Sequence, residues 1–253
     1  LRRIGAGWPG IPGMSLLLYI GTYSKRGSQG IYVAHVNPDT GALSPPAPAG
    51  YPDDLADPSW LAVRGSRLYA VSRTRDGAPP SGRLAAFRRL PDGRLRLDAA
   101  LPCGDGAPCH AILFDQGRRA AVSHYKNGRL FIARLEPDGR PAAIEAAFHT
   151  DGHGPVADRQ EGPHLHSAME SPDGTMLFAA DLGLDCIFQY DIRPHGLVAR
   201  PPLQCPPGSG PRHMAMAADG ATLWAVGELD STLIVFRRRD DGFHLAAHLS
   251  LLP

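Results

Sequence analysis

A short segment recurs four times along the chain, and this recurrence limits the possible folds more than any other feature. The copies begin at Pro58, Pro108, Pro163 and Pro211, so they are spaced by 50, 55 and 48 residues. Each copy starts with a short apolar run, which continues through a polar turn into a second apolar run. A period of about fifty residues made of strand-like segments is typical of β-propeller blades, each of which is a four-stranded sheet. The sequence therefore predicts an all-β propeller.

The copy that begins at Pro163 shows how four strands fit into one blade. Apolar and aromatic residues bounded by turn residues predict strands over 164–170, 175–180, 186–192 and 197–204. In the other copies an Asp-Gly dipeptide, which favours tight hairpins, marks the turn between the third and fourth strands. These dipeptides are Asp92-Gly93, Asp138-Gly139 and Asp241-Gly242.

The first blade is expected to lack one strand. Residues 15–23, 31–36 and 42–49 correspond to the second, third and fourth strands of a blade, and no first strand precedes them. Because an open ring leaves strand edges unpaired, we expect the sequence to be an incomplete propeller of about five blades, short of about two. We expect such a chain alone to be aggregation-prone or inactive, since Leu16, Leu18 and Ile234 would lose part of their cover.

Composition agrees with one globular body that has no charge preference for nucleic acid or membrane. The chain has 253 residues, 43% of them hydrophobic, and a formal net charge of +1. Residues 1–13 are rich in Gly and Pro and predict a disordered or non-native extension, followed by a propeller domain over 14–253. The apolar run over 16–20 is too short to cross a bilayer. Four cysteines without Cys-x-x-Cys spacing favour reduced thiols and a cytoplasmic protein.

Propeller topology predicts which polar residues meet. The first strand of each blade lines the central channel, and the linker into it opens on the same rim as the loop between the second and third strands. Strand alternation adds His166 beside His164 on the channel face. We expect a catalytic constellation at this rim. The candidates are Ser59, Cys109, His164, Arg212, Arg73, His124, Asp181 and Glu228.

Several of these histidines have a simpler interpretation. A single histidine in a strand, such as His110 or His124, is usually structural. His164 and His166 have a spacing that can ligate a metal, but no third ligand follows at a convincing spacing. We therefore predict no metal and no cofactor.

Five motifs make a specific resemblance. In this order along the chain they are 18–23 (LYIGTY), 159–167 (RQEGPHLHS), 180–185 (ADLGLD), 208–214 (GSGPRHM) and 228–232 (ELDST). Together they resemble the lactonase family of seven-bladed β-propellers, over residues 16–253. That family includes the bacterial propeller-type 6-phosphogluconolactonase and is similar to the fungal carboxy-cis,cis-muconate cyclase.

The resemblance implies that His164, Arg212 and Glu228 are catalytic. It implies hydrolysis of 6-phospho-D-glucono-1,5-lactone to 6-phosphogluconate, in the oxidative pentose phosphate pathway, without a metal. Either Glu228 or His164 would be the base, and Arg212 would hold the oxyanion or the product carboxylate. A further family arginine has no counterpart before the end of this sequence.

Substrate binding is expected to involve residues near the same rim. Arg159 is assigned to the phosphate because the planar guanidinium suits that group, and His166 to the hydroxyls or the phosphate. Asp181 and His110 complete the predicted substrate-binding set.

Two alternatives remain open at this point. One is a cyclase or another lactone-forming isomerase on the same scaffold. The other is a non-enzymatic interaction propeller, which would present apolar and aromatic residues at its rim rather than converging His, Arg and Glu. For the hydrolase, the expected partner is a small sugar-phosphate lactone, with no nucleic acid or membrane partner, and the protein would be a monomer or small homo-oligomer.

Overall fold

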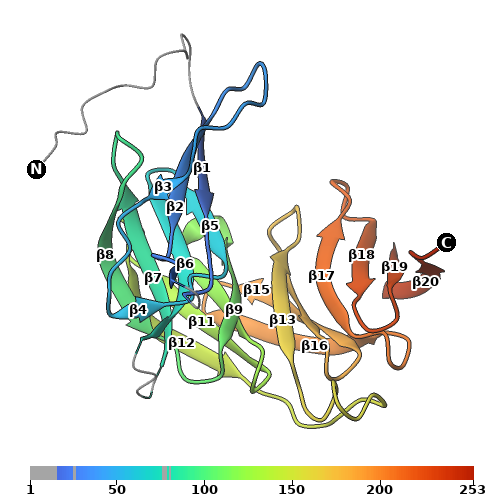
Figure 1. Cartoon of the computed structure of the whole chain (residues 1–253). Helices are drawn as coiled ribbons and strands as arrows, with labels where there is room; N and C mark the ends of the chain where they lie inside the picture. The colour runs from blue at the N-terminus through green and yellow to red at the C-terminus, as the bar shows by residue number, and fades with distance from the viewer. Residues whose placement is uncertain (1–15, 25–26, 76–78, 80) are drawn as a thin grey trace, which may run out of the picture.

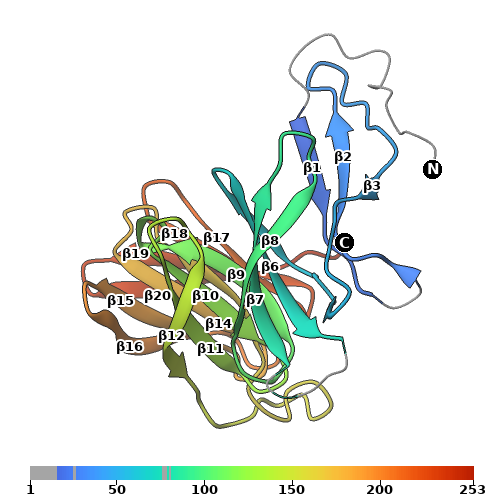
Figure 2. The same cartoon turned by 90° about the vertical axis from the view of Figure 1, so that its left-hand side faces the viewer.

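The computed structural model describes residues 16–24, 27–75, 79 and 81–253. It shows five antiparallel sheets that follow one another in sequence order along an arc (Figure 1). In the view turned by 90°, the first sheet stands at one end of this arc (Figure 2). The predicted all-β propeller architecture is confirmed, whereas the predicted extension over 1–13 lies outside the described residues.

Three of the five sheets have the four strands of a complete blade. The first sheet contains β1 (Leu16–Ile20), β2 (Tyr32–Val36) and β3 (Ala47–Pro48). The second contains β4 (Leu55–Ala56), β5 (Leu61–Arg64), β6 (Arg67–Thr74), β7 (Gly82–Arg89) and β8 (Leu95–Pro102). The third contains β9 (Pro108–Phe114), β10 (Arg119–His124), β11 (Arg129–Leu135) and β12 (Pro141–Phe148). The fourth contains β13 (Leu165–Glu170), β14 (Met176–Asp181), β15 (Cys186–Arg193) and β16 (Gly196–Gln204). The fifth contains β17 (Pro211–Met216), β18 (Thr222–Gly227), β19 (Thr232–Arg239) and β20 (Gly242–Ser250).

The first strand of the second sheet is split in two. Both β4 and β5 pair with β6, through Leu55 opposite Thr74 and Leu61 opposite Ala70. Pro58 lies between the two pieces and has no N–H to donate to a ladder, which explains the break.

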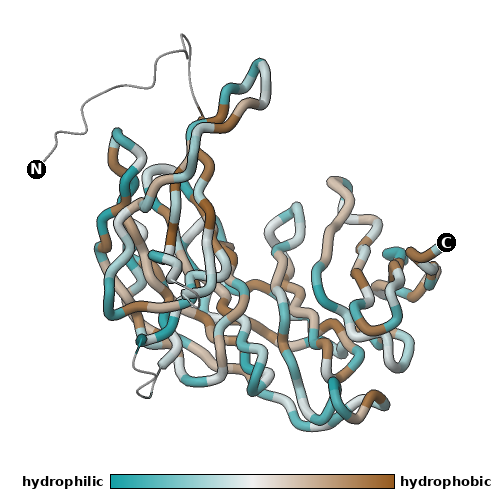
Figure 3. The backbone as a smooth tube through the Cα atoms, viewed as in Figure 1, coloured by the Kyte–Doolittle hydropathy of each residue, from teal (hydrophilic) through white to brown (hydrophobic). Residues whose placement is uncertain are grey.

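The core lies between successive sheets. Apolar side chains on one face of each sheet pack against the next sheet, and hydrophilic residues gather at the turns (Figure 3). Between the fourth and fifth sheets, for example, Phe178 packs with Leu223, Ile234 and Phe236, all of them fully or almost fully buried. Burying one such side chain contributes about 1.5–3 kcal/mol, so these interfaces hold the sheets in fixed positions.

One expectation about exposed apolar residues is wrong. Leu16 and Leu18 are exposed as predicted, but Ile234 is fully buried because its side chain faces the fourth sheet. Strand alternation directs the neighbouring positions to the other face of the fifth sheet, where Val226 and Leu249 are exposed.

Two expectations about the chain as a whole can be compared with the structure. The four cysteines are free thiols, as predicted. Within the described residues, no helix has the length and apolar character needed to cross a membrane.

The two rims of the arc carry different connections. Because the strands of each sheet are antiparallel, β13 and β17 begin at the rim where β10, β14 and β18 end. The hairpins between the first and second strands, and between the third and fourth strands, lie at the opposite rim. Residues at the start of a first strand and residues just after a second strand therefore lie at the same rim, in the third, fourth and fifth sheets.

Candidate functional site

A carboxylate between two arginines forms the centre of the candidate site. Glu228 directly follows β18. Its Oε1 accepts a hydrogen bond from Arg159 Nη2 (2.5 Å), and its Oε2 lies 2.8 Å from Arg212 Nε in an ion pair. Arg212 lies in β17, whereas Arg159 lies in the linker that leads into β13. The side chains of Arg159 and Arg212 are each about half exposed, at 41% and 46%, so both guanidiniums are accessible from the rim.

The charges of this group support one another. Burial alone would raise the pKa of Glu228, but the hydrogen bond from Arg159 and the charge of Arg212 outweigh it and lower the pKa. The hydrogen bonds that Arg159 makes with Glu228 and Tyr125 raise its pKa. Glu228 is therefore a carboxylate at neutral pH, and the group as a whole carries a net positive charge.

His166 extends the group along β13. Its Nε2 accepts a hydrogen bond from Arg212 Nε (3.0 Å), and burial and the charge of Arg212 lower its pKa to about 4. His166 is therefore neutral at pH 7. Its Nδ1 atom is buried without a hydrogen-bond partner among the described residues.

The His164 side chain is held by Tyr125 and Glu161. Its ring stacks on Tyr125 with centroids 4.4 Å apart and an interplanar angle of 5°. Its Nδ1 lies 2.8 Å from the carbonyl oxygen of Tyr125, and its Nε2 lies 3.2 Å from Glu161 Oε1. A carbonyl oxygen only accepts hydrogen bonds, so Nδ1 carries a hydrogen. The contact between Nε2 and Glu161 is an ion pair only in the imidazolium form, in which Nε2 carries a proton as well.

Asp181 fixes His164 from beneath rather than facing the rim. It is fully buried, and its Oδ1 accepts hydrogen bonds from the backbone N–H groups of His164 (2.8 Å), Gly183 (2.9 Å) and Leu184 (3.1 Å). Burial raises the pKa of Asp181 to about 6. The carboxylate orders the backbone around His164, and the role of Asp181 in substrate binding stays a prediction.

His110 belongs to an aromatic cluster that lines the channel. It is buried, its Nδ1 accepts the N–H of Ala168 (3.3 Å), and burial lowers its pKa to about 3. The ring of His110 lies 4.2 Å from that of Trp60 and 5.5 Å from that of His213. His110 therefore supports the channel wall, and its role in substrate binding stays a prediction.

His213 joins this cluster to the charged group. Its ring stacks on Trp60 at 5.4 Å and meets His166 edge to face at 5.2 Å. Trp60 is fixed by a hydrogen bond from its Nε1 to the carbonyl of Ala111 (2.9 Å). A neutral aromatic surface thus lies next to the arginines.

A β-bulge at the same position in three sheets explains how so many side chains reach this rim. The pairing of the first and second strands shifts by one residue at Cys109, at His166 and at Arg212-His213. Each bulge adds one residue to the first strand and changes the direction of the side chains that follow. The prediction that His166 lies beside His164 assumed strict strand alternation. That alternation does not hold at the bulge. Both histidines nevertheless lie against Tyr125.

The remaining predicted rim residues have structural partners. Arg73 forms an ion pair with Asp57, and His124 is buried with its Nδ1 3.1 Å from the carbonyl of Asp105. Ser59 donates its backbone N–H to the carbonyl of Asp57. Burial raises the pKa of the Cys109 thiol to about 12, which makes it a poor nucleophile.

Sequence reasoning missed Tyr125, Glu161, Trp60 and His213. Tyr125 follows His124 in a second-to-third loop, and Glu161 precedes His164 in the same motif, so position along the repeat could have indicated both. His213 could not be placed from the sequence, because regular strand alternation would direct its side chain to the face opposite that of Arg212. The bulge changes these directions. Within the described residues, no group of three His, Cys, Asp or Glu side chains is arranged to hold a metal ion.

Comparisons with known proteins agree with the observed fold and identify a family. The profile of the family described as "Lactonase, 7-bladed beta-propeller" matches residues 17–253. The 6-phosphogluconolactonase of Bacillus subtilis is 30% identical over 220 residues, which are 85% of this chain and 60% of that protein. The 6-phosphogluconolactonase of Formosa agariphila is 26% identical, over 87% of this chain and 63% of that protein.

A solved structure shows the same arrangement of sheets. The periplasmic gluconolactonase of Pseudomonas aeruginosa superimposes with a TM-score of 0.84 and 29% identity, over 94% of this chain and 69% of that one. The chain therefore spans less than two thirds of the length of the two curated relatives, and about two thirds of this structural neighbour.

Proposed function

Because the chain belongs to the lactonase family of seven-bladed β-propellers, we propose that it contributes the site for hydrolysis of 6-phospho-D-glucono-1,5-lactone to 6-phosphogluconate. The observation that carries this proposal is the convergence of Arg159, Arg212 and Glu228 beside His164 at one rim. Two relatives named 6-phosphogluconolactonase support the choice of substrate.

His164 is the base in this proposal, rather than Glu228. Both carboxylate oxygens of Glu228 already face guanidinium groups, and its lowered pKa makes it a weak base. His164 Nε2, by contrast, faces the carboxylate of Glu161, which would stabilise the imidazolium ion formed when the ring takes a proton. Glu228 then acts by positioning Arg159 and Arg212.

The arginines take the negative charges of the substrate. Arg212, which is linked to His166 and Glu228, would stabilise the carbonyl oxygen as it becomes an oxyanion. Arg159, which comes from the linker that leads into β13, would bind the phosphate with its planar fork of N–H groups. The neutral rings of Trp60 and His213 would pack against the C–H face of the sugar ring.

The reaction needs no external co-reactant besides water. His164 Nε2 takes a proton from water as the oxygen of that water forms a bond to the carbonyl carbon. The bond between that carbon and the ring oxygen then breaks, and the ring oxygen receives the proton from the imidazolium. The product is a carboxylic acid, which loses a proton to solvent, and a free hydroxyl group.

The test compares two variants on one substrate. With 6-phosphogluconolactone, His164→Asn is expected to lower kcat by about 10²–10⁴-fold if it removes the base. Glu228→Gln is expected to lower kcat less and to raise KM, because it releases the two arginines. His195→Asn, which changes an exposed histidine in the β15–β16 hairpin, is the matched control. A larger loss of kcat in Glu228→Gln than in His164→Asn would make Glu228 the base.

The compartment and assembly state are part of the same proposal. Four free cysteines are typical of a reducing compartment, so we place the protein in the cytoplasm, although its Pseudomonas neighbour is described as periplasmic. Binding of a small lactone does not require a second subunit. We therefore propose that the protein is a monomer or a small homo-oligomer. Cell fractionation and light scattering would test these two points.

A further inference from the structure

A hollow lies at the rim opposite the candidate site. Its volume is about 1100 Å³, near the upper end for small-molecule pockets. Its walls are turns between first and second strands, at 65–66, 115–117 and 174, and turns between third and fourth strands, at 136–139 and 193–194. Neither His164 nor Glu228 lines it, so this opposite-rim pocket is separate from the candidate site.

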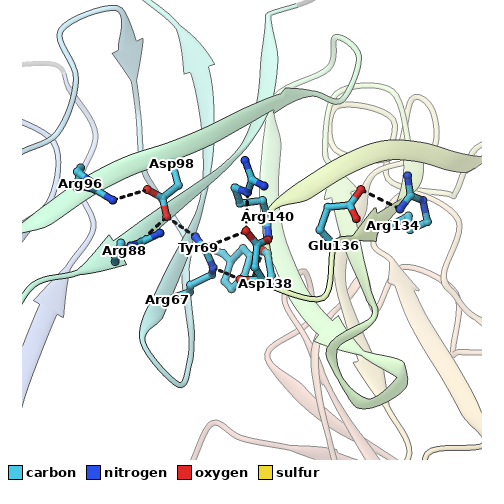
Figure 4. Close-up of polar contacts among 10 residues, drawn as sticks. Arg67, Tyr69, Arg88, Arg96, Asp98, Arg134, Glu136, Asp138 and Arg140 are labelled. Atoms are coloured by element: carbon cyan, nitrogen blue, oxygen red, sulfur yellow. Dashed lines mark hydrogen bonds and ion pairs between the residues drawn. The ribbon is translucent and has the colours of Figure 1, made fainter.

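Buried arginines are built into the pocket wall. Arg67 and Arg119 are only 7% and 5% exposed. Arg67 forms an ion pair with Asp98 (2.7 Å) and contacts Asp138 (Figure 4). Arg119 forms an ion pair with Asp115 (2.9 Å). A buried charge is retained at a considerable desolvation cost, so these arginines give the wall a fixed geometry.

A strained turn forms one end of the pocket. Asp115, Gln116 and Gly117 have φ values of 53°, 57° and 80°, and two of these three residues are not glycine. The turn is held by a hydrogen bond from the Asp115 N–H to Glu170 Oε1 (2.8 Å) and by Arg64, which donates to the carbonyl of Gln116. A Cβ at Gly117 would lie 2.2 Å from the Arg64 guanidinium and would displace that flexible side chain, and the φ of 80° itself favours glycine here. Backbone strain of this kind gathers at functional sites.

This end of the pocket has more cations than anions. Arg118 and Arg119 share the carboxylate of Asp115. In the described part of the chain, Arg64 has no carboxylate within 4.0 Å, and its guanidinium is held at the turn by a carbonyl. Three guanidiniums thus lie near two carboxylates, those of Asp115 and Glu170.

The other end of the pocket contains more carboxylates. Glu136 accepts from Arg134 (3.0 Å), and Glu145 also contacts Arg134 (3.9 Å). Asp138 accepts from Arg140 (2.7 Å) in the same region (Figure 4). Three carboxylates thus lie near the exposed Arg134 and Arg140 and the buried Arg67, and their remaining lone pairs can accept hydrogen bonds from hydroxyl groups.

We propose that the opposite-rim pocket binds a small organic anion, with its phosphate or carboxylate group at Arg64 and Arg118 and its hydroxyl groups toward Glu136 and Asp138. The pocket joins turns of the second, third and fourth sheets, so an occupant would link three sheets. Its site is independent of the lactone site.

The test is a titration of the purified chain with inorganic phosphate and, separately, with citrate, at constant ionic strength. Calorimetry gives the Kd, and the Nε–H signals of arginine in isotope-labelled protein give the location. The phosphate arm reports binding of a phosphoryl group and the citrate arm binding of carboxylates. We expect saturable binding of at least one probe.

Variants assign the binding to the pocket. Arg64→Gln and Arg118→Gln are each expected to weaken binding about tenfold, as for loss of one charge-assisted contact. The Arg118 side chain is exposed and contacts the Asp115 carboxylate rather than the turn backbone. The Arg118 variant therefore still tests the proposal if Arg64→Gln disturbs folding. Arg94→Gln, in the exposed β7–β8 hairpin outside the pocket, is the matched control, and His164→Asn controls for the candidate site. Absence of saturable binding, or equal Kd values in all variants, would overturn the proposal.

Discussion

Asp181→Asn is expected to change how the stability of the protein depends on pH. Asp181 is fully buried, its Oδ1 accepts three backbone N–H groups, and its Oδ2 has no hydrogen-bond partner among the described residues. Burial raises its pKa from 3.8 to about 6. The charged form is thus less favourable in the folded state than in the unfolded chain.

The sign follows from proton binding. Between about pH 4 and pH 6 the folded state holds a proton on Asp181 that the unfolded state has lost, so stability falls as the pH rises through this window. A shift of about two pKa units corresponds to about 3 kcal/mol, present below the window and lost above it. Asparagine has no such proton to lose. The free energy of unfolding of the variant minus that of the parent should therefore increase by about 2–3 kcal/mol from pH 4 to pH 7.

The assay is urea unfolding at several pH values, followed by both fluorescence and circular dichroism. Asn still offers an acceptor to the three N–H groups, but these bonds are weaker without the charge, so the absolute difference at one pH is not the test. Asp240→Asn, which removes an exposed carboxylate, controls for the change in net charge. A difference between Asp181→Asn and the parent that stays constant from pH 4 to pH 7 would refute the reasoning.

Three further predictions concern the candidate site. Gly183→Ala would place a Cβ 1.9 Å from the carbonyl oxygen of Gly162; we expect a loss of about 1–3 kcal/mol in urea unfolding and lower lactonase turnover. Gly162→Ala, whose Cβ would meet nothing within 4 Å, should be tolerated. Arg159→Lys is expected to raise KM for 6-phosphogluconolactone more than for unphosphorylated gluconolactone, because the planar fork at the phosphate is lost; equal effects on both substrates would remove Arg159 from the phosphate site. Lactonase turnover should be unchanged by prior incubation with a chelator, and loss of activity restored by zinc or manganese would contradict this.

The strand plan of the repeats was predictable because it depends on local chemistry. Turn residues such as Asp138-Gly139 and apolar runs such as 175–180 fix where strands begin and end, and the structure has these strands within a few residues of the prediction. The split of the first strand at Pro58 was not predicted, because it required knowing that two short pieces share one partner strand.

The face on which an apolar residue lies was less certain from the sequence. Ile234 was expected on the uncovered side of the fifth sheet and is buried against the fourth. In a strand whose residues are apolar on both sides, alternation alone does not say which side meets the neighbouring sheet.

The sequence by itself determined the repeat and the strands, since these follow from spacing and turn chemistry, and propeller topology predicted which residues lie near one rim. The bulges at His166 and at Arg212-His213 were decided only by the tertiary structure, as were the burial of Asp181 and His110. Glu228 illustrates the difference, because its place after a strand could be read from the repeat, whereas its contacts with Arg159 and Arg212 depend on two other segments. The physical reason is that pKa values, pairing and side-chain direction depend on neighbours distant in the sequence, which only the packing of the sheets brings together.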